Sequence, residues 1–283
     1  MIKKIAILLE MIKFEHTVFA LPFALIGAFL AGRGVPGLTV FGWIVLAMVG
    51  ARTCAMGFNR IVDRNFDKLN PRTADRALPA AQVKVGEAWA LVISAGVVFF
   101  YACYNLNRLT LLLSPFALAM TLFYSLTKRF TWLCHVVLGM ALAFSPLGGW
   151  VAVKGTLTDF PFVLSAGVLF WVAGFDTVYA CLDADFDRRV GLFSLPARFG
   201  RPAAFRLAVI FHVIAFGLFL ATGILSRLNF FYYAGLTFTG VALFYQHIVV
   251  NPRDLSRIQL SFFTMNGLIS LTLFVATWLS LVV

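Results

Sequence analysis

The stretch PAAFRLAVIFHVIAFGLFLATGI, residues 202–224, carries only one charged side chain, Arg206. An α-helix needs about 20 mainly apolar residues to cross the roughly 30 Å hydrocarbon core of a bilayer, so this stretch is long enough to span it. Runs of the same character occur along the whole chain, and none alternates as a barrel strand does. The expected spans are residues 17–32, 37–57, 86–105, 109–127, 132–153, 161–182, 202–224, 229–249 and 260–282. The chain is therefore predicted to be an all-α polytopic membrane protein with nine transmembrane helices.

The composition excludes a soluble globular protein. Of the 283 residues, 61% are hydrophobic and only 12% are charged, whereas soluble domains have about 25% charged residues. The short connections between spans predict one transmembrane domain over residues 1–283. Residues 1–14 have apolar side chains at helical spacing with charged ones between them, which predicts a short interfacial helix. The four cysteines and four histidines show no metal-ligand or disulfide spacing and are interpreted as core or interfacial residues.

The net charge of +11 is distributed unevenly between the two membrane faces. Eighteen of the 23 lysines and arginines fall at the N-terminus or in the loops on its side of the membrane, and four fall on the opposite face. The remaining one, Arg52, lies inside a span. The positive-inside rule therefore predicts a cytoplasmic N-terminus. The basic residues are explained mainly by topology, so no nucleic-acid partner is expected.

The acidic residues are concentrated at the ends of the second and sixth spans. Asn59, Asp63 and Asp67 are four residues apart, which places them on one helix face. A second helical face is predicted for residues with spacings of three or four. These are Asp176, Tyr179, Asp183 and Asp187. The two motifs lie four spans apart, so both are expected at the same, cytoplasmic end of the bundle.

Two such acidic faces brought together would repel each other unless cations lay between them. Mg²⁺ is the natural choice, because it prefers carboxylate and water oxygens and bridges to substrate phosphates. With the neighbouring basic residues, the motifs favour a metal–diphosphate site. The alternative is a set of solvated loop charges that follow the positive-inside rule. That alternative does not explain Asp176, which lies about two turns inside the sixth span, where a carboxylate is costly.

These motifs resemble those of the UbiA family of intramembrane aromatic prenyltransferases. The resemblance is carried by Asn59 with Asp63 and Asp67, by Tyr179 with Asp183 and Asp187, and by two basic segments. The basic segments are Asn70-Pro71-Arg72-Thr73-Ala74-Asp75-Arg76-Ala77-Leu78-Pro79 and Tyr124-Ser125-Leu126-Thr127-Lys128-Arg129. The chain departs from the family pattern at Arg60, where the family usually has an aspartate. The resemblance covers nearly the whole chain and implies nine helices around a central cavity.

The resemblance also implies an activity: Mg²⁺-dependent transfer of a polyprenyl group from its diphosphate to an aromatic ring. The expected acceptor is a hydroxylated aromatic acid, either 4-hydroxybenzoate in ubiquinone synthesis or 1,4-dihydroxy-6-naphthoate in menaquinone synthesis. A haem farnesyltransferase or chlorophyll synthase on the same scaffold is a further alternative. A transporter is the rival from another class, because intramembrane charges also mark transport pathways. The expected location is the bacterial inner membrane, with lipid around the bundle and the active site toward the cytoplasm.

The implied roles divide the candidate residues into four groups. The expected metal ligands are Asn59, Asp63, Asp67, Asp183 and Asp187. The expected diphosphate-binding residues are Arg64, Lys68, Arg72, Lys128 and Arg129. Tyr124 and Tyr179 are expected to stabilise an allylic cation by cation–π attraction. Arg52 is expected to hold the acceptor carboxylate or to pair with Asp176, and Asp176 is a candidate for orienting the acceptor or taking its proton.

Overall fold

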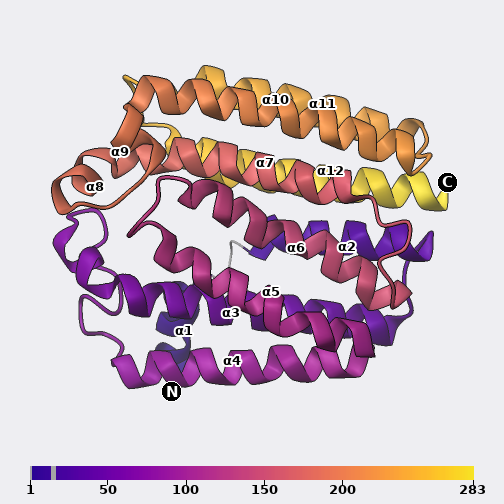
Figure 1. The fold of residues 1–283 in the computed structure, drawn as a ribbon, viewed down its shortest axis with the longest axis horizontal. Coiled ribbons are helices and arrows are strands. Elements are labelled where there is room, and N and C mark those ends of the chain that lie inside the picture. Colours follow the sequence, from indigo (N-terminus) through magenta and orange to yellow (C-terminus); the bar gives the residue numbers. More distant parts are fainter. Residues whose placement is uncertain (1, 14–16) are drawn as a thin grey trace.

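The computed structural model describes residues 2–13 and 17–283, and over these residues the chain is helical with no β-sheet. Figure 1 shows long helices lying side by side in a bundle, with the C-terminus at one end and the short helices α8 and α9 at the other. The helices are α1 (Ile2–Met11), α2 (Thr17–Gly32), α3 (Leu38–Leu69), α4 (Val85–Leu106), α5 (Arg108–Thr127), α6 (Cys134–Lys154), α7 (Phe162–Tyr179), α8 (Ala184–Val190), α9 (Leu195–Phe199), α10 (Arg201–Leu225), α11 (Phe230–Val249) and α12 (Asn266–Val282). A 3₁₀ turn (Ala180–Leu182) follows α7, and a π-helical turn (Leu260–Met265) precedes α12.

Seven segments in the described part of the chain are long and apolar enough to cross a membrane. The other two expected spans, 17–32 and 229–249, coincide with α2, which has 16 residues, and α11, which has 20. Large apolar side chains such as Leu112, Val213 and Phe244 are more than 60% exposed on the outside of the bundle. An apolar exterior of this extent fits lipid and not water, so the chain is an integral membrane protein.

Two of the four apolar clusters among the described residues hold most of the core. The larger joins α2, α6, α7, α10, α11 and α12 and contains Trp171, and the other joins α1, α3, α4 and α5 and contains Ala88. Close helix contact depends on small residues in places: a Cβ atom at Gly149 of α6 would overlap the carbonyl oxygen of Ala24 of α2. Side chains packed on both clusters, such as Leu138 and Met56, also line the polar site described below.

Of the two expected acidic faces, one lies on a continuous helix and the other is interrupted. The first lies on α3, which continues without a break to Leu69. The second was expected on one continuous helix, but α7 ends at Tyr179, and α8 begins only at Ala184 after the 3₁₀ turn. Figure 1 shows the break between α7 and α8 at the same end of the bundle as the loop after α3. The second motif is therefore split over two helices that meet at an angle.

Candidate active site

A cavity of about 680 Å³ lies between α3, α5, α6, α7 and the π-helical turn before α12. Its walls contain polar side chains from all these elements. The sequence-predicted residues that line it are Arg52, Asn59, Asp63, Asp67, Arg72, Tyr124, Lys128, Arg129, Asp176, Tyr179, Asp183 and Asp187. The structure therefore brings both acidic motifs and most of the predicted bases into one chamber.

The first acidic motif retains an unused carboxylate oxygen. Asn59 donates its amide N–H to Asp63 at 3.0 Å, as expected for side chains four residues apart on a helix. Asp67 is buried, and its Oδ1 accepts a hydrogen bond from Arg76 at 2.7 Å. Oδ2 of Asp67 is also buried but has no hydrogen-bond partner among the described residues. A buried oxygen without a hydrogen-bond donor is available to a cation, and this amide-and-carboxylate set is the donor chemistry that Mg²⁺ prefers.

In the second motif the carboxylates are held by bases. Asp183 accepts hydrogen bonds from Asn70 at 2.8 Å and from Arg72 Nε at 2.9 Å, and Arg72 Nη2 binds its other oxygen. Burial alone would raise the pKa of Asp183, but the bonds from Arg72 and Asn70 and the Arg72 charge lower it below its usual value. Asp183 is therefore ionised at neutral pH.

Asp187 is fully buried and has a similar arrangement. Lys128 Nζ lies 2.9 Å from its Oδ1, and Ser194 donates a hydrogen bond to its Oδ2 at 2.9 Å. Burial alone would lower the pKa of Lys128, but the charge and hydrogen bond of Asp187 raise it above its usual value. Lys128 therefore carries its charge beside Asp187.

The loop after α3 connects the two motifs. The Asn70 side-chain oxygen accepts the backbone N–H of Arg72 at 3.0 Å, and this turn directs the arginine toward α7. Arg72 also donates to the Tyr179 hydroxyl at 3.2 Å. On the other wall, Arg129 lies 3.7 Å from Asp63 and 5.5 Å from the centre of the Phe66 ring. The bases therefore lie between the acids, where a diphosphate would need them.

Two predicted phosphate-binding residues lie elsewhere. Arg64 and Lys68 are exposed and are not among the residues that line the chamber. Arg64 donates to the carbonyl oxygen of Ile61 in its own helix at 3.2 Å. The helical twist explains this position, because each residue directly follows an inward-facing aspartate and is rotated by about 100° from it.

The deeper part of the chamber contains Arg52, Tyr124 and Asp176. Asp176 was one suggested partner for Arg52, but its Oδ2 lies 2.6 Å from His135 Nδ1. Arg52 donates to the backbone carbonyl of Lys13 at 3.4 Å. Sequence reasoning missed His135, together with Asn70, Arg76 and Ser194. Asn70 and Arg76 belong to the segment 70–79, whose resemblance to the family could have identified them. The spacing of His135 and Ser194 gives no indication of a role in the site.

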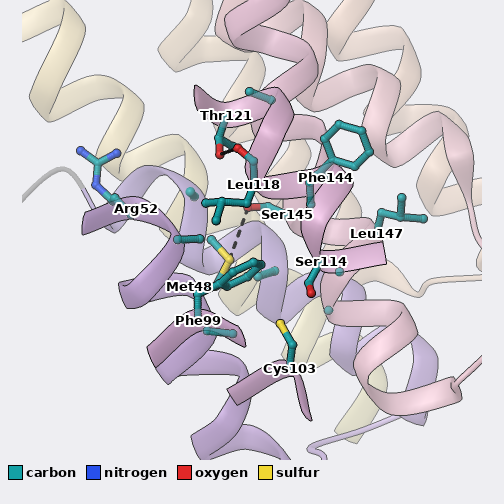
Figure 2. A pocket seen from close by; sticks show the side chains of 18 of the residues that line it. Met48, Arg52, Phe99, Cys103, Ser114, Leu118, Thr121, Phe144, Ser145 and Leu147 are labelled. Atoms are coloured by element: carbon teal, nitrogen blue, oxygen red, sulfur yellow. Dashed lines mark hydrogen bonds between the residues drawn. The ribbon is translucent and has the colours of Figure 1, made fainter. Parts of the chain in front are cut away.

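A second, apolar cavity of about 210 Å³ adjoins the deep end of the chamber. The two cavities share the lining residues Arg52, Met56, Tyr124, Leu138 and Leu142. Figure 2 shows Arg52 at one edge of the apolar cavity, away from Cys103 and Ser114. A molecule with a charged head and an apolar tail would therefore find a polar and an apolar compartment next to each other.

The position of Arg60 accounts for the departure from the family motif. Its side chain is buried, and its Nε donates to the carbonyl oxygen of Met11 at 3.0 Å. The charge lies near Asp67 and Asp63, which offset it electrostatically. Arg60 therefore fastens the N-terminal segment to α3 where an aspartate would add a metal ligand.

The chain is similar to known proteins over most of its length. A relative from Nitrosospira multiformis, named 4-hydroxybenzoate octaprenyltransferase, is 33% identical over 82% of this chain and 79% of its own. One of the same name from Cronobacter sakazakii is 32% identical over 89% of this chain and 86% of its own. The apo structure of a UbiA homologue from Aeropyrum pernix K1 matches 93% of this chain and 96% of that one, with a TM-score of 0.86 and 36% identity.

A UbiA homologue from Archaeoglobus fulgidus, solved with GPP and Mg²⁺, has the same fold at 18% identity and a TM-score of 0.69, over 98% of this chain and 100% of that one. The sequence profile of the UbiA prenyltransferase family matches residues 20–268. Together with the fold and the paired acidic motifs, these matches show that the chain belongs to the UbiA prenyltransferase family.

Proposed function

We propose that this protein transfers a polyprenyl group from polyprenyl diphosphate to a hydroxylated aromatic acid, 4-hydroxybenzoate, in quinone biosynthesis. The observation that carries the proposal is the single chamber in which the two acidic motifs meet with Arg72 and Lys128 between them. The names of the Nitrosospira and Cronobacter relatives support this acceptor.

The first motif fits a magnesium ion. Asn59, Asp63 and Asp67 would hold it, with the buried Oδ2 of Asp67 as the oxygen that lacks a partner. No three His, Cys, Asp or Glu side chains among the described residues form a ready metal site, so diphosphate oxygens and water must complete the coordination. When bound, the metal neutralises the diphosphate and polarises the C1–O bond of the donor.

In this proposal Arg72 and Lys128 exchange their aspartate partners for the diphosphate. Arg72 and Lys128 are occupied by Asp183 and Asp187 in the structure. An incoming diphosphate offers them better acceptors, because charge-assisted bonds to phosphate oxygens strengthen as the leaving group gains charge. Asp183 and Asp187 would then be available to hold a second Mg²⁺. Arg129, which lies at the edge of the chamber beside Asp63, also reaches the phosphate.

The apolar cavity takes the prenyl chain. It begins at Arg52 and Tyr124 and extends between α3, α4, α5 and α6. Exclusion of water there protects the allylic cation that forms when the C1–O bond breaks. The faces of Tyr124 and Tyr179, both in the wall of the polar chamber, stabilise that cation by cation–π attraction.

The acceptor binds at the depth of Arg52 and Asp176. Arg52 precedes Asn59 by seven positions on α3, or about 10 Å along the helix axis, and Asp176 on α7 precedes Asp183 by seven positions. Arg52 holds the acceptor carboxylate, for which a planar guanidinium is suited. Asp176 faces the ring. A 1,4-dihydroxy-6-naphthoate acceptor presents the same carboxylate and is the alternative that the assay must separate.

Location follows from the charge distribution of the sequence. We place residues 1–283, as one domain, in a bacterial inner membrane with the N-terminus and the acidic motifs on the cytoplasmic side. The α1 helix lies at the interface in this arrangement, where Lys4 pairs with Glu87 at 2.7 Å.

The test is a product assay. Purified protein in detergent is incubated with Mg²⁺, geranyl diphosphate and either acceptor, and pyrophosphate and prenylated ring are quantified. Prenylated 4-hydroxybenzoate is the expected product. Product from the naphthoate alone would overturn the acceptor assignment. Absence of both pyrophosphate release and ring product would overturn the proposed function.

A further inference from the structure

The His135–Asp176 pair forms a proton-handling unit in the deep part of the chamber. His135 lies in the first turn of α6, and its Nδ1 is 2.6 Å from Asp176 Oδ2 on α7. The imidazole is 2% exposed, whereas the Asp176 side chain is 21% exposed. Both residues line the chamber, and the aspartate is the more exposed of the two, so it is the better placed to meet a bound molecule.

The hydrogen bonds fix the tautomer of His135. The backbone N–H of Leu195 donates to Nε2 at 3.3 Å, so Nε2 carries a lone pair and the ring proton is on Nδ1. His135 therefore donates its Nδ1–H, and Asp176 Oδ2 accepts it.

The backbone segment that donates to His135 is held in place by further hydrogen bonds. Leu195 is the first residue of α9, and its neighbour Ser194 caps that helix and donates to Asp187. The backbone N–H of Phe193 donates to the carbonyl oxygen of Lys128 at 2.7 Å. One short segment, 193–195, thus anchors both the second acidic motif and the ring that holds Asp176.

We propose that His135 is the positioning residue for Asp176, and that Asp176 accepts the proton that the acceptor ring releases. This inference rests on the proposed function. The donor C1–O bond breaks and diphosphate leaves with its electron pair. A ring carbon then uses a π pair to bond C1. Oδ1 of Asp176 takes the hydrogen from that carbon as a proton, and the C–H electrons restore the aromatic ring.

His135 contributes by holding Oδ2, which restricts the rotamer of the carboxylate and leaves Oδ1 as the oxygen for the acceptor. Without the Nδ1–H donor, the carboxylate would turn or be protonated, and proton removal would become slow. The C–C bond would still form, because ionisation of the donor uses the other end of the chamber. A purely structural histidine would leave the proton-transfer step unchanged.

The experiment compares the full-length wild type with His135→Leu, His135→Gln and Asp176→Asn. Each is assayed in detergent with geranyl diphosphate, Mg²⁺ and either 4-hydroxybenzoate or its 3,5-dideuterated form. Because the isotope effect is a ratio measured on the active enzyme in each sample, partial misfolding does not alter it. His247→Gln is the matched control. It changes another histidine, which is half-buried, is hydrogen-bonded to His212 at 2.8 Å and does not line the chamber.

In the wild type and His247→Gln, ionisation limits the rate and the isotope effect on ring product is close to unity. In His135→Leu, kcat for ring product falls about 10- to 100-fold, KM for the aromatic acid changes little, and the isotope effect rises above about 2. His135→Gln retains an amide donor and acceptor and restores most of kcat. Asp176→Asn releases pyrophosphate with little ring product.

A unit isotope effect in His135→Leu and His135→Gln, with ring product still formed, would overturn the positioning role. So would a loss confined to KM. If His135→Leu yields no active protein, the isotope effect of His135→Ala, which also lacks the Nδ1–H donor, decides: a value above that of the wild type supports the role, and an unchanged value overturns it. Wild-type protein that makes no ring product contradicts the proposed function instead, so the two failures are distinguishable.

Discussion

The guanidinium of Arg72 binds both carboxylate oxygens of Asp183, with Nε 2.9 Å from Oδ1 and Nη2 on Oδ2. Arg72 lies in the loop that follows the first acidic motif and Asp183 lies in the second motif, 111 positions further along the chain. This contact joins the loop after α3 to the residue that precedes α8. In the proposed mechanism it keeps a base for the diphosphate and an acid for the metal side by side until the substrate separates them.

Removal of Arg72 tests this contact. In Arg72→Ala, Asp183 keeps only its Asn70 donor, and the diphosphate loses a bidentate partner. We expect the kcat/KM for prenyl diphosphate to fall at least 100-fold, and the Tm of the detergent-solubilised protein to fall by about 2–10 °C. Arg253→Ala, in the loop between α11 and α12, is the control and should match the wild type. Unchanged kcat/KM in Arg72→Ala would remove Arg72 from the diphosphate site.

The metal assignment predicts a specific requirement at Asp67. EDTA should abolish activity and added Mg²⁺ should restore it. Asp67→Asn removes the unpartnered carboxylate oxygen, so the Mg²⁺ concentration for half-maximal rate should rise at least about 10-fold. Asp185→Asn is the control, because that aspartate is exposed and pairs with Arg201 at 2.9 Å. An equal Mg²⁺ requirement in both variants would contradict the first-motif metal site.

The pKa shifts of Asp183 and Lys128 predict how stability depends on pH. The lowered pKa of Asp183 stabilises the fold above its unfolded value of about 3.9, and this contribution is lost as pH falls through the folded value. The raised pKa of Lys128 stabilises the fold below about 10.4 and is lost as pH rises through the folded value. The Tm difference between wild type and Asp183→Asn should therefore be constant from pH 5 to 9 and shrink below about pH 4. A difference that grows with acidity would reverse the assigned sign.

The apolar cavity predicts control of chain length. Ser114 on α5 lies in its wall, so Ser114→Phe should obstruct a long prenyl chain more than a short one. We expect the ratio of kcat/KM for farnesyl to that for geranyl diphosphate to fall about 10-fold or more. Leu112→Phe enlarges an exposed position on the same helix and should leave the ratio unchanged. Equal effects of the two variants on this ratio would contradict the placement of the prenyl chain in the apolar cavity.

Much of the site follows from local periodicity. Asn59, Asp63 and Asp67 could be assigned to one face because α3 is an unbroken helix, and the same rule shows why Arg64 and Lys68 face away. The break at Ala180–Leu182 could not be predicted, since the segment has neither proline nor glycine. The pairing of His135 with Asp176 depends on the packing of α6 against α7, which no spacing within either helix encodes.

The central claim is that the two acidic motifs and their bases hold a diphosphate beside an acceptor at Arg52 and Asp176. The most direct measurement is an experimental structure with an unreactive thiolodiphosphate analogue of the donor, Mg²⁺ and 4-hydroxybenzoate. We predict the diphosphate between Asp67 and Arg72, the chain in the apolar cavity, and the acceptor carboxylate on Arg52. A diphosphate bound outside the chamber, or an acceptor remote from Arg52 and Asp176, would contradict this account.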